Sequence, residues 1–323
     1  MLTGIGIYFD LRNPPRWERP WADHYADSLD MMATAEQLGA SAIWLTEHHF
    51  FEDGYLPQPL TMAAAVAART SRVRIGTAVY LPLLRTPAQV AEEAAVVDII
   101  SGGRLDLGVG TGRLPQEFAA FASSMDRPFT RLEAQIREVR RLWDEKVTPA
   151  PVQRPLPLWG GFFGPRGARI AGRLNMGLLA ADRRLLTPYR DGLTEGGHDP
   201  AAARMRALAP VFVADDPDAA WPLIKPHVEY QWDSYRRYDA EGAGQPAPPP
   251  ADGEDLRRRE KGRPSWFVLT DVSGAVSYLR ALSRDLPLDE VYCWGTVAGL
   301  DSGLARRHVE LLLREVLPRL QRP

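Results

Sequence analysis

The stretch Ala42-Ile43-Trp44-Leu45-Thr46-Glu47-His48-His49-Phe50 joins a strand pattern to a cluster of reactive side chains. Its first four residues form a short apolar run that is typical of a buried parallel strand. Two imidazoles and a carboxylate follow at the C-terminal end of that strand. In parallel α/β folds this end carries the loops that perform chemistry. The alternative is that His48 and His49 are ordinary polar residues that close a strand.

Strand and helix patterns alternate along the rest of the chain. Short apolar runs predict strands at residues 3–9, 42–45, 73–81, 104–110, 157–161, 176–181, 208–214 and 290–295. Helical patterns follow most of them, at residues 25–38, 59–70, 86–100, 131–143, 166–174 and in the C-terminal stretch from 309 to 320. Eight strand–helix units favour a (β/α)8 TIM barrel, built by one domain of residues 1–323, over a doubly wound sheet.

Residues 230–266 interrupt this alternation between the seventh and eighth predicted strands. The segment begins with several aromatic residues and continues into a proline-rich and then a charged stretch. This composition predicts a structureless, mobile insertion, either a lid or a disordered segment. Its place above the C-terminal face of the barrel favours a lid.

The composition is that of an ordinary soluble enzyme. Of the 323 residues, 45% are hydrophobic and 25% are charged, and the net charge of -2 gives no reason to expect a nucleic acid or a membrane as partner. The first residues lack the pattern of a secretory signal, and no apolar run is long enough to span a bilayer. The single cysteine, Cys293, lies in an apolar run, which favours a buried hydrophobe over a nucleophile and fits a reducing cytoplasm.

Two glycine-rich stretches follow predicted strands. Residues 108–113 lack the third glycine of a dinucleotide-binding fingerprint, since Arg113 stands there, so they favour a loop that lets a flat ring or a phosphate approach the backbone. The alternative is a plain tight turn. Residues 160–167 place glycines before a predicted helix and beside Arg166, which favours an anion site for a phosphate. The alternative is a set of plain loop glycines.

A metal site is not expected. Glu47, His48 and His49 are consecutive, so their side chains alternate in an extended chain and cannot all converge on one ion. The sequence also lacks the paired histidine or cysteine motifs that would supply further ligands. Alternation means that one of the two histidines points into the barrel mouth, where a pKa near 6.5 suits general acid–base work.

Three stretches together resemble the luciferase-like flavin-dependent monooxygenases, the family of the bacterial luciferases. They are WLTEHHFFEDGYLPQP (residues 44–59), RIGTAVYLPLLRTPAQVAEEAAVVDIISGGRLDLGVGTGRLPQEF (residues 74–118) and LLREVLPRL (residues 312–320). The resemblance is weak between Ala180 and Trp266. It rests on the order and spacing of these stretches, each at the expected turn of the barrel.

The resemblance implies a TIM barrel that binds reduced FMN non-covalently and forms a peroxyflavin with O2 in a pocket shielded from water. It implies that His48 is the catalytic histidine, that the Ala78–Val79 peptide is cis against the flavin ring, and that residues 161–166 bind the phosphate. It also implies a homodimer through the helices after strands two and three, where residues 63–68 and 91–97 offer small side chains, and a mobile lid at residues 230–266. The expected site residues are Glu47, His48, Ala78, Val79, Gly110, Arg113, Arg131, Gly161, Phe162, Gly164 and Arg166.

Some positions depart from the family pattern. Thr111 stands where bacterial luciferase has an arginine, and Arg113 where many relatives have a tyrosine, so the partner of the phosphate could be Arg113, Arg127, Arg131 or Arg166. Gly110 replaces the reactive cysteine of the luciferases, so the resemblance does not extend to light emission from long-chain aldehydes.

Three functions stay open on the sequence. The first is a two-component monooxygenase that receives reduced FMN from a separate flavin reductase and oxygenates a small organic substrate, with His48 as acid–base and Glu47 orienting the site or packing beneath it. The second is an oxidoreductase of the same fold that transfers hydride with a deazaflavin coenzyme. The third is a flavin-binding protein without catalysis.

Overall fold

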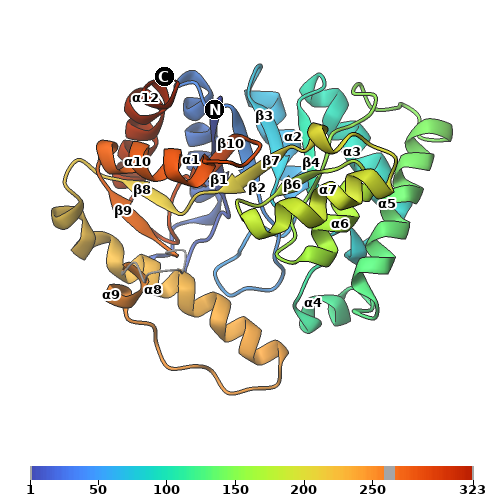
Figure 1. The fold of residues 1–323 in the computed structure, drawn as a ribbon. Helices are drawn as coiled ribbons and strands as arrows, with labels where there is room; N and C mark the ends of the chain where they lie inside the picture. Colours follow the sequence, from blue (N-terminus) through green and yellow to red (C-terminus); the bar gives the residue numbers. More distant parts are fainter. Residues whose placement is uncertain (1, 258–265, 322–323) are drawn as a thin grey trace.

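The computed structural model describes residues 2–257 and 266–321, and within them eight parallel strands close into a barrel (Figure 1). Their order around the barrel is β1-β10-β7-β6-β5-β4-β3-β2. The barrel strands are β1 (Gly4–Phe9), β2 (Ala42–Leu45), β3 (Arg74–Thr77), β4 (Leu105–Val109), β5 (Leu158–Gly160), β6 (Gly177–Leu179), β7 (Met205–Leu208) and β10 (Leu288–Trp294). The predicted TIM barrel is confirmed.

Helices follow the strands, and most of them cover the barrel from outside, while α8 lies across one end of it. They are α1 (Trp21–Gln37), α2 (Pro59–Arg69), α3 (Pro87–Ser101), α4 (Pro115–Ala120), α5 (Pro128–Glu145), α6 (Pro165–Arg173), α7 (Leu186–Glu195), α8 (Pro217–Gly242), α9 (Gly253–Arg257), α10 (Val272–Ser283), α11 (Ser302–Glu310) and α12 (Leu317–Leu320). Many begin with proline, whose missing N–H and fixed φ suit a first helical position. No helix in residues 2–257 and 266–321 is long and apolar enough to cross a membrane.

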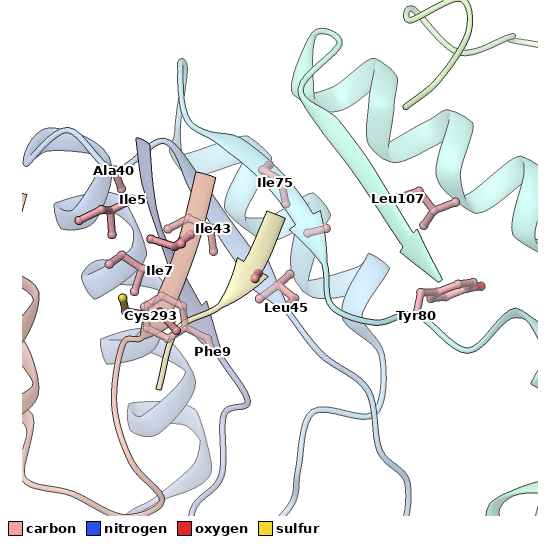
Figure 2. Packing of buried hydrophobic residues seen from close by; sticks show 14 of the residues in the cluster. Ile5, Ile7, Phe9, Ala40, Ile43, Leu45, Ile75, Tyr80, Leu107 and Cys293 are labelled. Carbon is pink, nitrogen blue, oxygen red and sulfur yellow. The ribbon is translucent and has the colours of Figure 1, made fainter. Parts of the chain in front are cut away.

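The strands are buried on both faces, which is why the sequence shows them as continuous apolar runs. Ile5, Ile7 and Ile43 lie in the main core beneath the helices (Figure 2). The inner face instead carries an aromatic cluster in which the Trp44 and Tyr292 rings stack at 4.8 Å. Cys293 is buried in the main core, as predicted, and burial raises the pKa of its thiol to about 12.

The seventh strand was predicted at the wrong place. The barrel strand is β7, and the predicted run 208–214 mostly forms β8 (Val211–Val213), which pairs in parallel with β9 (Val268–Thr270) outside the barrel. Pro210 separates β7 from β8, because a proline cannot donate a hydrogen bond within a sheet. The apolar run therefore belongs to two sheets.

The prediction of a structureless insertion at residues 230–266 is wrong in its first third. Residues 230–242 form the second half of α8, whose start is capped by the Asp216 carboxylate. Pro222 and Pro226 lie inside the first half of the helix and hid it in the sequence, since proline normally ends a helix. The remainder contains α9, and the part at residues 258–265 lies outside the described residues.

His308 in α11 makes the stability of the fold depend on pH. Its Nδ1 accepts from the Val213 backbone N–H at 2.7 Å and its Nε2 donates to the Trp294 carbonyl at 2.9 Å. Burial lowers the pKa of His308 to about 4. Because the unfolded chain binds a proton near pH 6.5 and the folded chain does not, stability decreases as the pH falls from about 6.5 to about 4, by about 3 kcal/mol.

Urea unfolding of the wild type and of His308→Gln across this pH range checks this prediction. The wild type should lose free energy of unfolding more steeply than the variant, which lacks the titrating imidazole. Equal pH slopes of the two proteins would contradict it.

Candidate active site

His48 lies just beyond the C-terminal end of β2 and is paired with a carboxylate. Its Nδ1 lies 2.9 Å from the Oε1 atom of Glu117, and its side chain is 13% exposed while that of Glu117 is fully buried. Burial lowers the pKa of His48 below its ordinary value, opposed by the hydrogen bond and charge of Glu117 and reinforced by the charges of Arg113 and Arg12. With Nδ1–H donating to Glu117, Nε2 is left as the basic atom.

Glu47 points to the opposite side of the chain and is fully bonded. Its Oε1 lies 2.8 Å from His49 Nε2 and accepts from Arg85 Nη1 at 2.6 Å, and its Oε2 accepts from the Leu81 backbone N–H at 2.7 Å. The side chains of His48 and His49 therefore point to opposite sides of the chain, as predicted. Glu47 holds the segment after β3 in place and lies in the wall of the barrel, away from the His48 ring.

The segment after β3 contains the expected cis peptide between Ala78 and Val79. The Val79 side chain packs against two of the predicted glycines. A Cβ atom on Gly110 would lie 2.6 Å from Val79 Cγ2, and one on Gly161 would lie 2.3 Å from Val79 Cγ1. These glycines therefore make room for Val79 at the mouth. The structure brings three predicted cofactor-binding residues, Val79, Gly110 and Gly161, into contact.

The loop before α6 presents an open helix N-terminus. Gly164 occupies the capping position without a side-chain hydrogen bond, and nothing lies within 4 Å of the place where its Cβ would be. Phe162 is buried beneath the loop, whereas Arg166 is exposed and lies over the Phe129 ring at 5.2 Å. Uncapped N–H groups at the start of a helix can donate hydrogen bonds to a phosphate.

The other candidate arginines have partners in the protein. Arg113 forms an ion pair with Asp239 of α8, and Arg131 donates to the Ser124 carbonyl and to Ser123 Oγ. Arg127 is exposed and pairs with the neighbouring Asp126 at 3.3 Å. Of the predicted set, Arg166 is nearest in sequence to the open helix start, and Arg113 faces α8 instead.

The second half of α8 covers the mouth of the barrel next to His48 (Figure 1). The Tyr238 ring stacks on Phe51 at 3.7 Å, and its hydroxyl accepts from the Glu52 backbone N–H at 2.6 Å. The ring of Phe51 in turn stacks on His48 at 4.8 Å. The insertion therefore contributes an aromatic cover to the site.

Arg12, in the loop after β1, holds this cover in place. Its buried guanidinium pairs with Asp53 at 2.9 Å, donates to Ser234 Oγ at 2.5 Å, and lies over the Tyr235 ring at 4.8 Å. Burial raises the pKa of the neighbouring Asp10 to about 6. The sequence gives no sign of this role of Arg12, because its partner Ser234 is 222 residues away.

Glu117 was also missed, although its sequence context gives a local signal. Pro115 suits a first helical position and would have predicted a helix that starts there and carries Glu117 in its first turn. What the sequence does not show is that this turn packs on the loop after β2, where Glu117 Oε1 also accepts from the His49 backbone N–H at 2.8 Å.

Replacing Glu117 by glutamine tests the pair. The Glu117 charge raises the pKa of His48, so its removal should lower that pKa further and move the acid limb of the kcat/KM profile to lower pH. We expect kcat/KM at neutral pH to fall by about tenfold or more, since general acid–base catalysis contributes about 10²–10⁴-fold. Glu92→Gln, which removes an exposed carboxylate from α3, is the control. An unmoved acid limb in Glu117→Gln would contradict the pairing.

Comparison with known proteins places this chain in a family. The model of the luciferase-like monooxygenases matches residues 5–272. The chain is 31% identical over 209 residues to an F420-dependent glucose-6-phosphate dehydrogenase of Amycolatopsis mediterranei, and this alignment covers 57% of the chain and 62% of the relative, less than two thirds of its length.

Solved structures share the fold over nearly the whole chain. The monooxygenase RslO1 of Streptomyces bottropensis has a TM-score of 0.81 at 25% identity, with 99% of each chain covered. The oxygenating constituent of 3,6-diketocamphane monooxygenase from Pseudomonas putida, solved with FMN, has a TM-score of 0.76 at 18% identity over the full length of both chains. Since the family model covers most of the chain, the chain belongs to the luciferase-like monooxygenase family.

Proposed function

We propose that this chain is a flavin-dependent oxidoreductase in which His48 is the general acid–base, and that it acts as the oxygenase of a two-component FMN monooxygenase. The observation that carries the proposal is the pair of the largely buried His48 and the fully buried Glu117 under the aromatic cover of α8. A histidine held through Nδ1, with Nε2 free of partners among the described residues, is arranged to exchange a proton with a bound molecule.

The residues at the mouth fit FMN. The open N–H groups at the start of α6, with Gly164 and Arg166, would hold the phosphate, and Ala78 and Val79 would support the ring. Reduced FMN, when bound, would supply the two electrons with which one atom of O2 is inserted into a small organic substrate and the other is released as water. FMN would be held by these contacts, without a covalent link.

His48 and Glu117 divide the proton chemistry between them. Because burial keeps the pKa of His48 low, its Nε2 is unprotonated at neutral pH and can accept a proton. Glu117 fixes the ring and stabilises the charged form that results. Glu47 acts indirectly, because it holds Leu81 and Arg85 next to the Ala78–Val79 segment.

The aromatic cover over His48 suits a reaction with O2. Phe51, Tyr235 and Tyr238 exclude water from the His48 side of the mouth, and exclusion of water protects reactive intermediates from side reactions. Opening of α8 would admit the substrate, so residues 230–242 would act as an ordered lid, with a separate flavin reductase as the source of reduced FMN.

Hydride transfer with the deazaflavin F420 is the second candidate. The similarity of the chain to the dehydrogenase of Amycolatopsis mediterranei, which is F420-dependent by name, supports this candidate. In this reaction His48 would donate or accept the proton that accompanies the hydride. The anionic tail of F420 would need basic partners at the rim; exposed Arg166 could serve, and exposed Arg127 could serve if it left Asp126.

The proposed homodimer would use the outer surface of α3. Ala63 and Ala91 are buried within the chain, so these two small residues pack inside one subunit. Val96 and Ile100 are 48% and 47% exposed and would form the contact.

An anaerobic titration distinguishes the candidates. Reduced FMN and reduced F420 are titrated separately into the protein, and oxygen is then admitted while the absorbance of the cofactor is recorded. Tight binding of reduced FMN, followed by a long-lived absorbance change and an oxygenated product, is expected. Binding of F420 alone without an oxygen reaction would move the protein to hydride transfer. Binding without turnover of any substrate would leave a non-catalytic flavin-binding protein, and binding of neither cofactor would refute the proposal.

A further inference from the structure

A cavity of about 370 Å³ lies between η1 (Pro15–Trp17), α8 and the chain at residues 247–251. Neither His48 nor any of the expected cofactor-binding residues lines it. Its volume falls within the range of small-molecule sites in proteins, which is about 300–1,000 Å³. The proposed chemistry therefore leaves a space of ligand size without a role.

This cavity lies on a different side of α8 from the cover of His48. Tyr230, Asp233 and Arg237 line the cavity and are three or four residues apart, so they share one side of the helix. Tyr235 is two residues from both Asp233 and Arg237 and therefore points elsewhere, toward the His48 ring. The cavity is a second space, separate from the barrel mouth.

Hydrogen bonds to α8 hold the outer wall of the cavity in place. Three of the five residues 247–251 are prolines, which restrict the backbone. At the end of this wall the Ala251 backbone N–H donates to Asp233 Oδ1 at 2.9 Å, and the Gly253 backbone N–H donates to Glu229 Oε1 at 2.8 Å. The protein itself fixes the wall, which lowers the conformational cost of binding a ligand.

The charges around the cavity leave one cation without a partner. The two lining carboxylates, those of Glu229 and Asp233, have cations on the same helix at 3.8 Å and 3.1 Å. Arg237 forms an ion pair with Glu52. Within residues 2–257 and 266–321, Arg16 forms no ion pair, and its guanidinium lies over the ring of its neighbour Trp17 at 5.0 Å. A carboxylate on a ligand would supply the missing partner.

Two aromatic rings form an apolar corner of the cavity. The rings of Trp17 and Tyr230 lie edge to face at 5.9 Å, and Pro226 and Pro248 add apolar surface beside them. Aromatic rings pack edge to face or offset against a further ring, so this corner suits a flat aromatic body. Trp17 belongs to η1 and Tyr230 to α8, so one ligand would contact both elements.

We propose that this cavity is a second ligand site, which binds a small aromatic carboxylate. Arg16 binds the carboxylate group, and Trp17 and Tyr230 pack against the ring. The bound molecule contacts both η1 and α8 and so holds α8 against the barrel. This inference goes beyond the proposed function and does not depend on the identity of the cofactor.

Three probes of similar shape and different charge test the site. Benzoate, benzamide and benzylamine are titrated separately into the full chain without cofactor, and binding is followed by NMR. We expect benzoate to bind most tightly. Arg16→Gln should weaken benzoate binding by about tenfold or more, the factor that one charged hydrogen bond contributes, and should leave benzamide binding unchanged. Arg72→Gln, which removes an exposed arginine at the opposite end of the barrel, is the matched control.

A cavity-filling variant locates the binding. Ala247→Trp places a large ring in the cavity from an exposed position, so it should abolish binding of benzoate and benzamide while the thermal unfolding midpoint changes little. In the wild type, benzoate should also slow amide hydrogen exchange in α8, and in Ala247→Trp it should not.

Three results would overturn the inference. They are no binding of benzoate to the wild type, tighter binding of benzylamine than of benzoate, and an unchanged affinity for benzoate in Arg16→Gln or Ala247→Trp. The last result would place the benzoate elsewhere, such as at the barrel mouth. Because these measurements use neither cofactor nor turnover, their failure would leave the proposed function standing.

Discussion

Replacing His48 by alanine is expected to reduce turnover by about 10²–10⁴-fold, the contribution that a positioned acid–base group typically makes. The variant should bind the cofactor with nearly the affinity of the wild type, because the phosphate contacts proposed at the start of α6 lie on another element. Steady-state kinetics with the substrate, together with the cofactor titration, measures the two effects separately. In a monooxygenase, the lost product should appear instead as released hydrogen peroxide.

His198→Ala is the control for this experiment, since His198 follows α7 and takes no part in the site. Addition of imidazole to His48→Ala should restore part of the activity if the ring itself exchanges the proton. Full turnover in His48→Ala would remove the central role proposed for this residue. Loss of cofactor binding together with turnover would instead assign His48 to the binding of the cofactor.

Gly192→Ala is expected to destabilise the fold strongly. Helices α6 and α7 pack backbone against backbone, and a Cβ atom on Gly192 would lie 2.0 Å from the Arg169 carbonyl oxygen. The reciprocal contact is equally close, with a Cβ on Gly172 at 2.2 Å from the Tyr189 carbonyl oxygen. Since both obstacles are main chain, the helices must separate. We expect a loss of about 3 kcal/mol, although alanine favours helix formation by about 1 kcal/mol over glycine.

Urea unfolding of Gly192→Ala measures this loss, and Arg190→Ala on the exposed side of the same helix is the matched control. The control should change the free energy of unfolding by about 0.5 kcal/mol at most. Because α6 carries the proposed phosphate site, Gly192→Ala should also weaken FMN binding. A stability equal to that of the wild type would show that the two helices can move apart without cost.

The barrel was predictable because its signal is local. A strand that is buried on both faces needs an apolar residue at nearly every position, so Ala42–Leu45 and the other barrel strands stand out in the sequence. The exceptions have local causes too. Pro210 divides one apolar run between two sheets, and Pro222 and Pro226 hide a helix that their surroundings nonetheless stabilise.

The site was predictable only in part, because the residues that interact in it come together only when the chain folds. His48 could be singled out from its place after a strand, yet its partner Glu117 is 69 residues away. Arg113 was expected near a phosphate and instead forms an ion pair with Asp239 of α8, an element that the sequence did not predict. Residues that meet only after folding leave no spacing pattern in a single sequence.

The side sheet of β8 and β9 suggests how relatives of this chain could diversify. Residues 214–267 leave the last residue of β8 and return at the first residue of β9, and these two strands are paired with each other and with no barrel strand. The ends of this segment are therefore anchored independently of what lies between them. We therefore expect that transplanting the corresponding segment from a relative would change the substrate range while the barrel and the pair of His48 and Glu117 stay in place.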